Sequence, residues 1–127
     1  MLKRVFLFAA LFWTGIILFF CLIQSSDVPK INIEEFDKVV HAFFHFVFVT
    51  LWFLFFNKKL NSINSFQPLA ISFVFSLVFG IIIEILQYYT TTRSADIFDV
   101  LANTIGALLA TLFIILANDS KGLKDKI

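Results

Sequence analysis

The sequence predicts an all-α protein, a bundle of four transmembrane helices with both termini in the cytoplasm. Hydrophobic residues make up 60% of its 127 residues, and the mean hydropathy is +0.93, whereas a soluble domain is only about half apolar. The hydrophobic residues also gather into four runs, and Glu84 is the only charged residue inside any of them. Because 127 residues suit one domain, we expect residues 1–127 to form a single membrane domain.

Each hydrophobic run has the length of a membrane span. At about 1.5 Å per residue, each run forms a helix roughly as long as the ~30 Å hydrocarbon layer is thick. Lipid offers no hydrogen-bond partner to an open backbone, so we expect helices in these runs. The predicted spans are 5–23, 39–56, 69–89 and 100–117.

The first run could be read as a secretory signal peptide, because Lys3 and Arg4 precede it. It is longer than the ~7–15 apolar residues of a signal peptide, and no small-residue cleavage pattern follows it. We therefore expect 5–23 to be a retained first helix.

Basic residues favour one orientation in the membrane. Three segments of the chain would share the side of the two termini, and they hold seven of the ten basic residues: Lys3, Arg4, Lys58, Lys59, Lys121, Lys124 and Lys126. The other side holds Lys30, Lys38 and Arg93. By the positive-inside rule both termini should be cytoplasmic.

Polar residues from four separate parts of the chain should meet at one membrane level on the outer side. They lie at the start of the second span, the end of the third, the loop that follows it and the start of the fourth. These predicted site residues are Asp37, Lys38, His41, Glu84, Gln87, Arg93, Asp96, Asp99 and Asn103.

Helical spacing groups these residues into stripes. Asp37, His41 and His45 recur every four residues, so they should share one helix face. Asp96, Asp99 and Asn103 form a second polar stripe at the start of the fourth span. It continues into Gly106 and Ala110, whose small size suits close packing of membrane helices.

Glu84 is the most informative single residue. A charged side chain at mid-membrane costs roughly 2.5–3.5 kcal/mol on insertion scales, so it suggests a functional site. The alternative is an ion pair or hydrogen bond that locks helices together, with Arg93, Lys38 or His41 as partner. Arg93 could itself hold a carboxylate or phosphate with two hydrogen bonds, or serve as an interfacial anchor.

His41 could act as a general acid or base, oriented by Asp37 one turn away, or could be a hydrogen-bonded packing residue. With His45 it offers two imidazoles at the i, i+4 spacing, but the pattern lacks the glutamate of metalloproteases. We therefore expect no metal and no cofactor. Asp96 and Asp99 could form a catalytic pair, or could favour the positive end of a helix whose N-cap is Ser94 or Asp96.

Other features narrow the classes of function. A net charge of +1 without a basic cluster argues against nucleic acid as a partner. Cys21 is the single cysteine, so no intramolecular disulfide can form. No glycine-rich phosphate loop and no G-x-S-x-G elbow occurs in the sequence.

The ordered set of motifs resembles the VanZ-like family of small bacterial membrane proteins. The motifs are Asp37-Lys38-x-x-His41, Glu84-x-x-Gln87, Arg93-Ser94-x-Asp96-x-x-Asp99 and Asn103-x-x-Gly106. The resemblance implies a multi-pass protein of the bacterial cytoplasmic membrane. The family takes its name from a member associated with low-level resistance to teicoplanin, a glycopeptide that acts on cell-wall precursors, and it has no settled biochemical activity. His45 is not part of the pattern.

Two functions rank first. The protein could bind an anionic lipid, a cell-wall precursor or a glycopeptide, with Lys38 and Arg93 holding the anion. It could instead be an enzyme acting on a lipid-linked envelope substrate, with His41 and Glu84 as acid and base and Arg93 as anion clamp. A purely structural role ranks third and transport last, because the ionisable groups form no ladder across the membrane. The lipid bilayer is the one certain partner, and the sequence leaves the oligomeric state open.

Overall fold

A computed structural model describes residues 1–22, 34–60, 66–90 and 97–126 of the chain. They form four helices, and no strand occurs within these ranges. The helices are α1 (Leu2–Leu22), α2 (Glu34–Leu60), α3 (Phe66–Thr90) and α4 (Ile97–Lys126). The prediction of an all-α protein with four helices is therefore confirmed.

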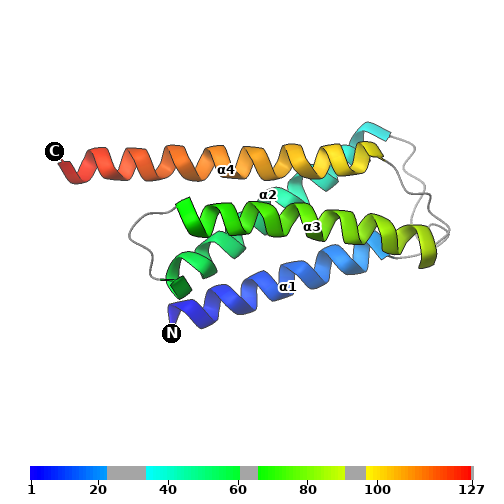
Figure 1. Cartoon of the computed structure of the whole chain (residues 1–127), viewed down its shortest axis with the longest axis horizontal. Coiled ribbons are helices and arrows are strands. Elements are labelled where there is room, and N and C mark those ends of the chain that lie inside the picture. Colours follow the sequence, from blue (N-terminus) through cyan, green and yellow to red (C-terminus); the bar gives the residue numbers. More distant parts are fainter. Residues whose placement is uncertain (23–33, 61–65, 91–96, 127) are drawn as a thin grey trace.

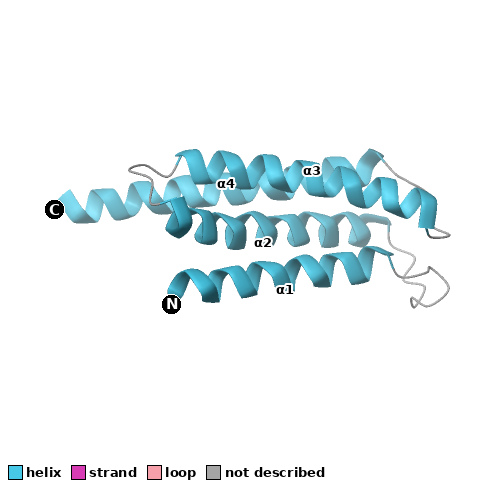
Figure 2. Cartoon of the chain, turned by 60° about the horizontal axis from the view of Figure 1, so that its bottom comes forward, coloured by secondary structure: helices cyan, strands magenta, loops and turns pink. Residues whose placement is uncertain are grey.

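Successive helices run in opposite directions, so both termini lie at the same end of the bundle (Figure 1). We call this end the termini end. The opposite end, where α1 and α3 finish and α2 and α4 begin, is called the polar end. Figure 2 shows α2 between α1 and the pair formed by α3 and α4. In this position α2 contacts all three other helices, α4 most extensively.

All four helices are long and apolar enough to cross a membrane. The spans are Leu2–Leu22, Asp37–Leu60, Phe66–Tyr89 and Ile97–Asn118. Each begins two or three residues before the predicted run, because a helix satisfies its own backbone hydrogen bonds and continues through polar residues at its ends. Large apolar side chains such as Phe12 and Leu112 face outward, as lipid contact requires.

Towards the termini end, aromatic rings fill the space between α1, α2 and α3. Phe48 is fully buried and stacks on Phe79, with the ring centroids 4.8 Å apart and the planes 8° from parallel. Trp52 meets the edge of Phe75 at 5.0 Å. Ring stacking and edge contacts of this kind add to the dispersion energy of a core. We call Phe48, Trp52, Phe75 and Phe79 the aromatic core.

The contact between α2 and α4 depends on small residues instead. A Cβ atom placed on Gly106 would lie 2.0 Å from the carbonyl oxygen of Ala42, so the two backbones touch at this point. Ala110, one turn further along α4, is fully buried. The packing role predicted for Gly106 and Ala110 is thus supported, and this close approach brings the first turns of α2 and α4 together.

Candidate functional site

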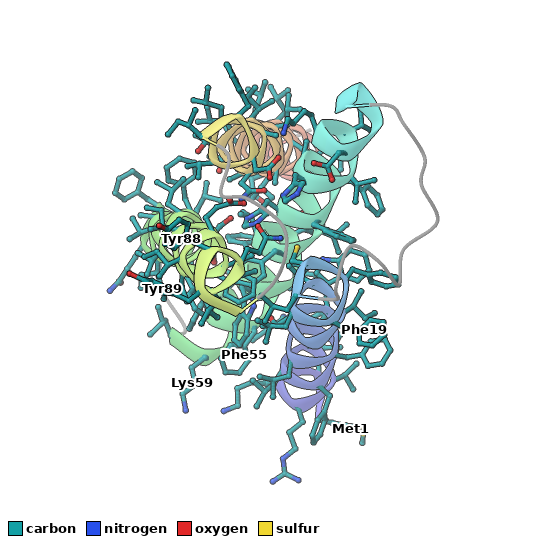
Figure 3. All side chains as sticks on the ribbon, turned by 90° about the vertical axis from the view of Figure 1, so that its right-hand side faces the viewer. Met1, Phe19, Phe55, Lys59, Tyr88 and Tyr89 are labelled. Atoms are coloured by element: carbon teal, nitrogen blue, oxygen red, sulfur yellow. The ribbon has the colours of Figure 1, made fainter. Side chains whose placement is uncertain are left out.

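Polar side chains are buried between the helices at the polar end. Figure 3 looks onto this end and shows oxygen and nitrogen atoms gathered between α2, α3 and α4. Five of the predicted site residues are at most 7% exposed: His41, Glu84, Gln87, Asp99 and Asn103. Burial of so many polar groups is costly unless they are hydrogen-bonded or paired. Their partners therefore define what the site can do.

Lys38 joins α2 to α4 at the rim of the site. Its Nζ donates a hydrogen bond to Oδ1 of Asp99 and lies 3.7 Å from Oδ2 of Asp37. The side chains of Lys38 and Asp37 remain 29% and 37% exposed, whereas that of Asp99 is 9% exposed. The site is thus open at Asp37 and Lys38 and closed beneath them.

His41 lies directly below this rim. Its Nε2 is 3.7 Å from Oδ1 of Asp37 and 3.7 Å from Oδ2 of Asp99. On the other side of the ring, Nδ1 is 3.0 Å from Oδ1 of Asn103. An amide oxygen only accepts, so Nδ1 carries a proton and donates it. We call Asp37, Lys38, His41, Asp99 and Asn103 the charged cluster.

The third helix supplies the other wall. A Cβ atom on Gly80 would lie 2.9 Å from Nδ2 of Asn103 and 3.2 Å from Cε1 of His45, so α3 approaches the charged cluster closely here. Glu84 is one turn nearer the polar end on the same face of α3, and it is 6% exposed. A carboxyl group therefore lies buried at the side of the charged cluster.

Gln87 has a different partner from the rest. Its Nε2 donates a hydrogen bond of 2.6 Å to the carbonyl oxygen of Cys21, near the end of α1. This contact ties α3 to α1. Of the predicted site residues in the described ranges, Gln87 is thus the one with a clear structural bond to the first helix. Cys21 is itself buried.

Sequence reasoning left out a second polar pair deeper in the bundle. Nδ1 of His45 lies 2.7 Å from Oγ of Ser76, and both residues are buried. His45 therefore turns to α3 and shares no ligand geometry with His41. The available signal was the spacing on α3, where Ser72, Ser76, Gly80 and Glu84 recur every four residues. Buried polar groups thus continue below the predicted level.

Arg93 and Asp96 lie outside the described residues, as does the other candidate N-cap, Ser94. The fourth helix begins at Ile97, so Asp99 occupies its first turn. A carboxylate there is favoured by the positive end of the helix dipole, in agreement with the non-catalytic interpretation of Asp99.

Two tyrosines mark the outer surface near the polar end. Tyr88 and Tyr89 are 65% and 77% exposed and project away from the bundle in Figure 3. Such amphipathic rings favour the boundary between lipid and water. They therefore place the charged cluster close to one membrane surface.

Comparison with known proteins agrees with the ordered motifs. The family model described as VanZ/LLP1 matches residues 5–118, a range that includes the charged cluster and the apolar parts of all four helices. No curated protein and no solved structure matches the chain. The chain therefore belongs to the VanZ/LLP1 family, and its four spanning helices make it a multi-pass membrane protein.

Proposed function

We propose that the polar end binds the anionic headgroup of a membrane lipid or of a lipid-linked cell-envelope precursor. The protein would lie in the cytoplasmic membrane of a bacterium with its termini in the cytoplasm, so that the site faces the cell envelope. The observation that carries the proposal is the graded exposure of the charged cluster. Asp37 and Lys38 are open at the rim, and buried polar groups lie below them.

This gradient suits a ligand that is itself part of the bilayer. The outer faces of the helices are apolar, so a lipid tail can lie along them while its headgroup reaches the rim. Lys38 is the cation of the described part of the site, and a lysine binds phosphate as a point charge. Arg93 enters the proposal as a second cation on its sequence position alone.

A role in teicoplanin resistance follows from the same location. Glycopeptides act on cell-wall precursors outside the membrane, where the site would lie. A protein that holds such a precursor, or the antibiotic itself, would change how much of the precursor the antibiotic reaches. We propose this role for the chain as a consequence of headgroup binding.

The test compares two lipids that differ in one group, undecaprenyl phosphate and undecaprenol. Thermal unfolding of the detergent-purified protein should shift to higher temperature with the phosphate and much less with the alcohol, because a ligand that binds only the folded state stabilises it. Lys38→Gln should remove most of the difference. Lys58→Gln is the matched control, since it makes the same change on α2 at the termini end.

An equal shift with both lipids, or an equal effect of the two lysine variants, would contradict headgroup binding at this site. A survival assay under teicoplanin checks the consequence in cells. Cells that produce the Lys38→Gln variant should be as sensitive as cells without the protein, while the Lys58→Gln variant should protect like the wild type.

An enzyme acting on a lipid-linked substrate is the second candidate. It is favoured by His41, a buried imidazole held by Asn103 on one side and facing two carboxylates on the other. In this reading His41 and Glu84 serve as acid and base. Glu84→Gln should then abolish turnover of undecaprenyl-linked substrates while helix content and unfolding temperature stay near those of the wild type. Unchanged turnover in a folded variant would remove Glu84 from the mechanism.

A further inference from the structure

We infer that the charged cluster binds a divalent transition-metal ion, such as Zn²⁺ or Mn²⁺, through Asp37, His41 and Asp99. One ligand atom from each of these residues lies within 4.8 Å of the other two. The three come from two helices that are held together at Gly106, so the donor set does not depend on a loop. One imidazole and two carboxylates form a donor set that both ions accept.

The hydrogen bond of His41 points to a cation independently of the acidic residues. Because Nδ1 donates to Asn103, a neutral ring presents the lone pair of Nε2 to the two carboxylates. Three electron-rich atoms then face one another in a site where His41 is only 4% exposed. Among the described residues, the ammonium group of Lys38 balances one of the two carboxylates, so a divalent ion at Nε2 would balance the other and accept the lone pair.

The distances favour a metal ion over a proton. A proton on Nε2 would form a hydrogen bond of about 2.7–3.2 Å to a carboxylate, but Nε2 lies 3.7 Å from each oxygen. Nitrogen and oxygen ligands about 2.1 Å from a tetrahedral zinc ion are about 3.4 Å from one another. The observed separations are therefore nearer to those of two ligands of one ion than to those of a hydrogen-bonded pair.

The neighbouring residues also match the surroundings of known metal sites. A metal-bound histidine usually donates its other N–H to a carbonyl or carboxylate, and Asn103 accepts in that position. The two oxygens of the Asp99 carboxylate also have separate partners. Oδ1 accepts a hydrogen bond from Lys38, while Oδ2 faces His41. The exposed edge of Asp37 supplies a path for the ion to enter.

The metal would change the charge that the site offers to a ligand. Among the described residues of the charged cluster, two carboxylates and one lysine give a net charge of −1 when His41 is neutral. A divalent ion makes this +1, and three protein ligands leave a coordination position open for water or for a phosphate oxygen. This last step rests on the proposed headgroup binding, whereas the metal site itself rests on the geometry.

The sequence predicted no metal because only His41 and His45 were weighed as a pair of ligands. That pair is separated in the structure, because His45 bonds to Ser76. Two carboxylates complete the donor set. Asp37 lies four residues before His41 on α2, whereas Asp99 lies on α4 and is far from His41 in the sequence. A contact of the latter kind leaves no local spacing pattern in the sequence.

The experiment measures metal binding with the metal alone. Protein purified without a histidine tag is treated with a chelator, exchanged into metal-free detergent buffer and titrated with Zn²⁺ in a calorimeter, with bound metal counted by mass spectrometry. We expect one ion per chain, and at least tenfold weaker binding in Asp37→Asn, whose side chain is exposed enough to be replaced without unfolding. Asp125→Asn, in the last turn of α4 at the termini end, is the matched control.

Cobalt gives a readout on the wild type that needs no variant. Co²⁺ bound by one nitrogen and two oxygen ligands should show visible absorption typical of low coordination number, and Zn²⁺ should abolish it. Absence of bound metal in the wild type, or equal binding by Asp37→Asn and Asp125→Asn, would overturn the inference.

Repeating the lipid comparison with and without Zn²⁺ separates the two proposals. If Zn²⁺ binds at the charged cluster and undecaprenyl phosphate still gains no preference over undecaprenol, the metal site stands and headgroup binding fails. If the titration shows that the wild type binds no Zn²⁺, and undecaprenyl phosphate is still preferred over undecaprenol, headgroup binding stands and the metal site fails.

Discussion

The second helix is packed in two different ways along its length. In its first half, residues 37–45, the inward side chains are charged or polar and meet α3 and α4 through specific hydrogen bonds. In its second half, residues 48–56, the inward side chains are apolar, and most of them are aromatic rings that pack by stacking and edge contacts. The aromatic half is specified mainly by volume. The polar half depends on the position of individual atoms, so we expect it to tolerate substitution less well.

The largest effect should come from the contact that holds the polar half together. In Gly106→Ala the new methyl group would overlap the carbonyl oxygen of Ala42, and backbone atoms cannot move aside as a flexible side chain can. We expect a loss of about 3 kcal/mol or more in the free energy of unfolding, at the upper end of overpacking effects. The measurement is unfolding by SDS titration, followed by circular dichroism.

Gly15→Ala is the control for that change. A Cβ atom on Gly15 meets nothing within 4 Å, so the same substitution in α1 should cost nothing. If both variants lose equal stability, the effect belongs to the loss of a helical glycine in general, and the close approach of α2 and α4 is not what holds the polar end.

A smaller loss of stability should follow when Asp99, the buried carboxylate that pairs with Lys38, is removed. In Asp99→Leu, the ammonium group of Lys38 and the imidazole of His41 lose a carboxylate. Breaking a fully buried ion pair costs about 3–5 kcal/mol, and the partial exposure of Lys38 should reduce this to about 2 kcal/mol. The measurement is again the free energy of unfolding.

The double variant Lys38→Met/Asp99→Leu decides what the ion pair is for. Replacement of both partners by apolar residues is often neutral for stability, so we expect recovery to within about 1 kcal/mol of the wild type. A stable double variant that has lost lipid and metal binding assigns the pair to function. If it binds both as the wild type does, the charges at these two positions serve only to join α2 to α4.

These two halves were not equally readable from the sequence. The apolar runs located the four membrane spans to within four residues, because hydropathy is a local property, whereas α4 continues nine residues beyond the predicted run. The stripe Asp37, His41 and the stripe Asp99, Asn103 predicted which faces would meet. The specific bonds were not predictable: Lys38 with Asp99 and Gln87 with the carbonyl of Cys21 join residues that are distant in sequence. Which atoms face each other there depends on how the helices are rotated and tilted.

The smallest loss of stability should come from removing a hydrogen bond in the aromatic half. Nε1 of Trp52 donates a hydrogen bond of 3.2 Å to Oγ1 of Thr14 on α1, so one polar bond is present among the stacked rings. Trp52→Phe keeps an aromatic side chain and removes this donor, and Thr14→Val removes the acceptor with little change in shape. Thr14→Val should cost about 1 kcal/mol, the usual net value of one hydrogen bond, and Trp52→Phe should cost more because it also removes buried ring volume.

The coupling energy between the two changes tests whether the aromatic half is less specific than the polar half. If volume dominates this half, the double variant Trp52→Phe/Thr14→Val should cost nearly the sum of the two single changes, with a coupling below about 0.5 kcal/mol. A coupling larger than 1 kcal/mol would mean that the bond between α1 and α2 is as specific as those of the polar half. The two ends of α2 would then differ in the residues they use and not in how strictly those residues fix the neighbouring helices.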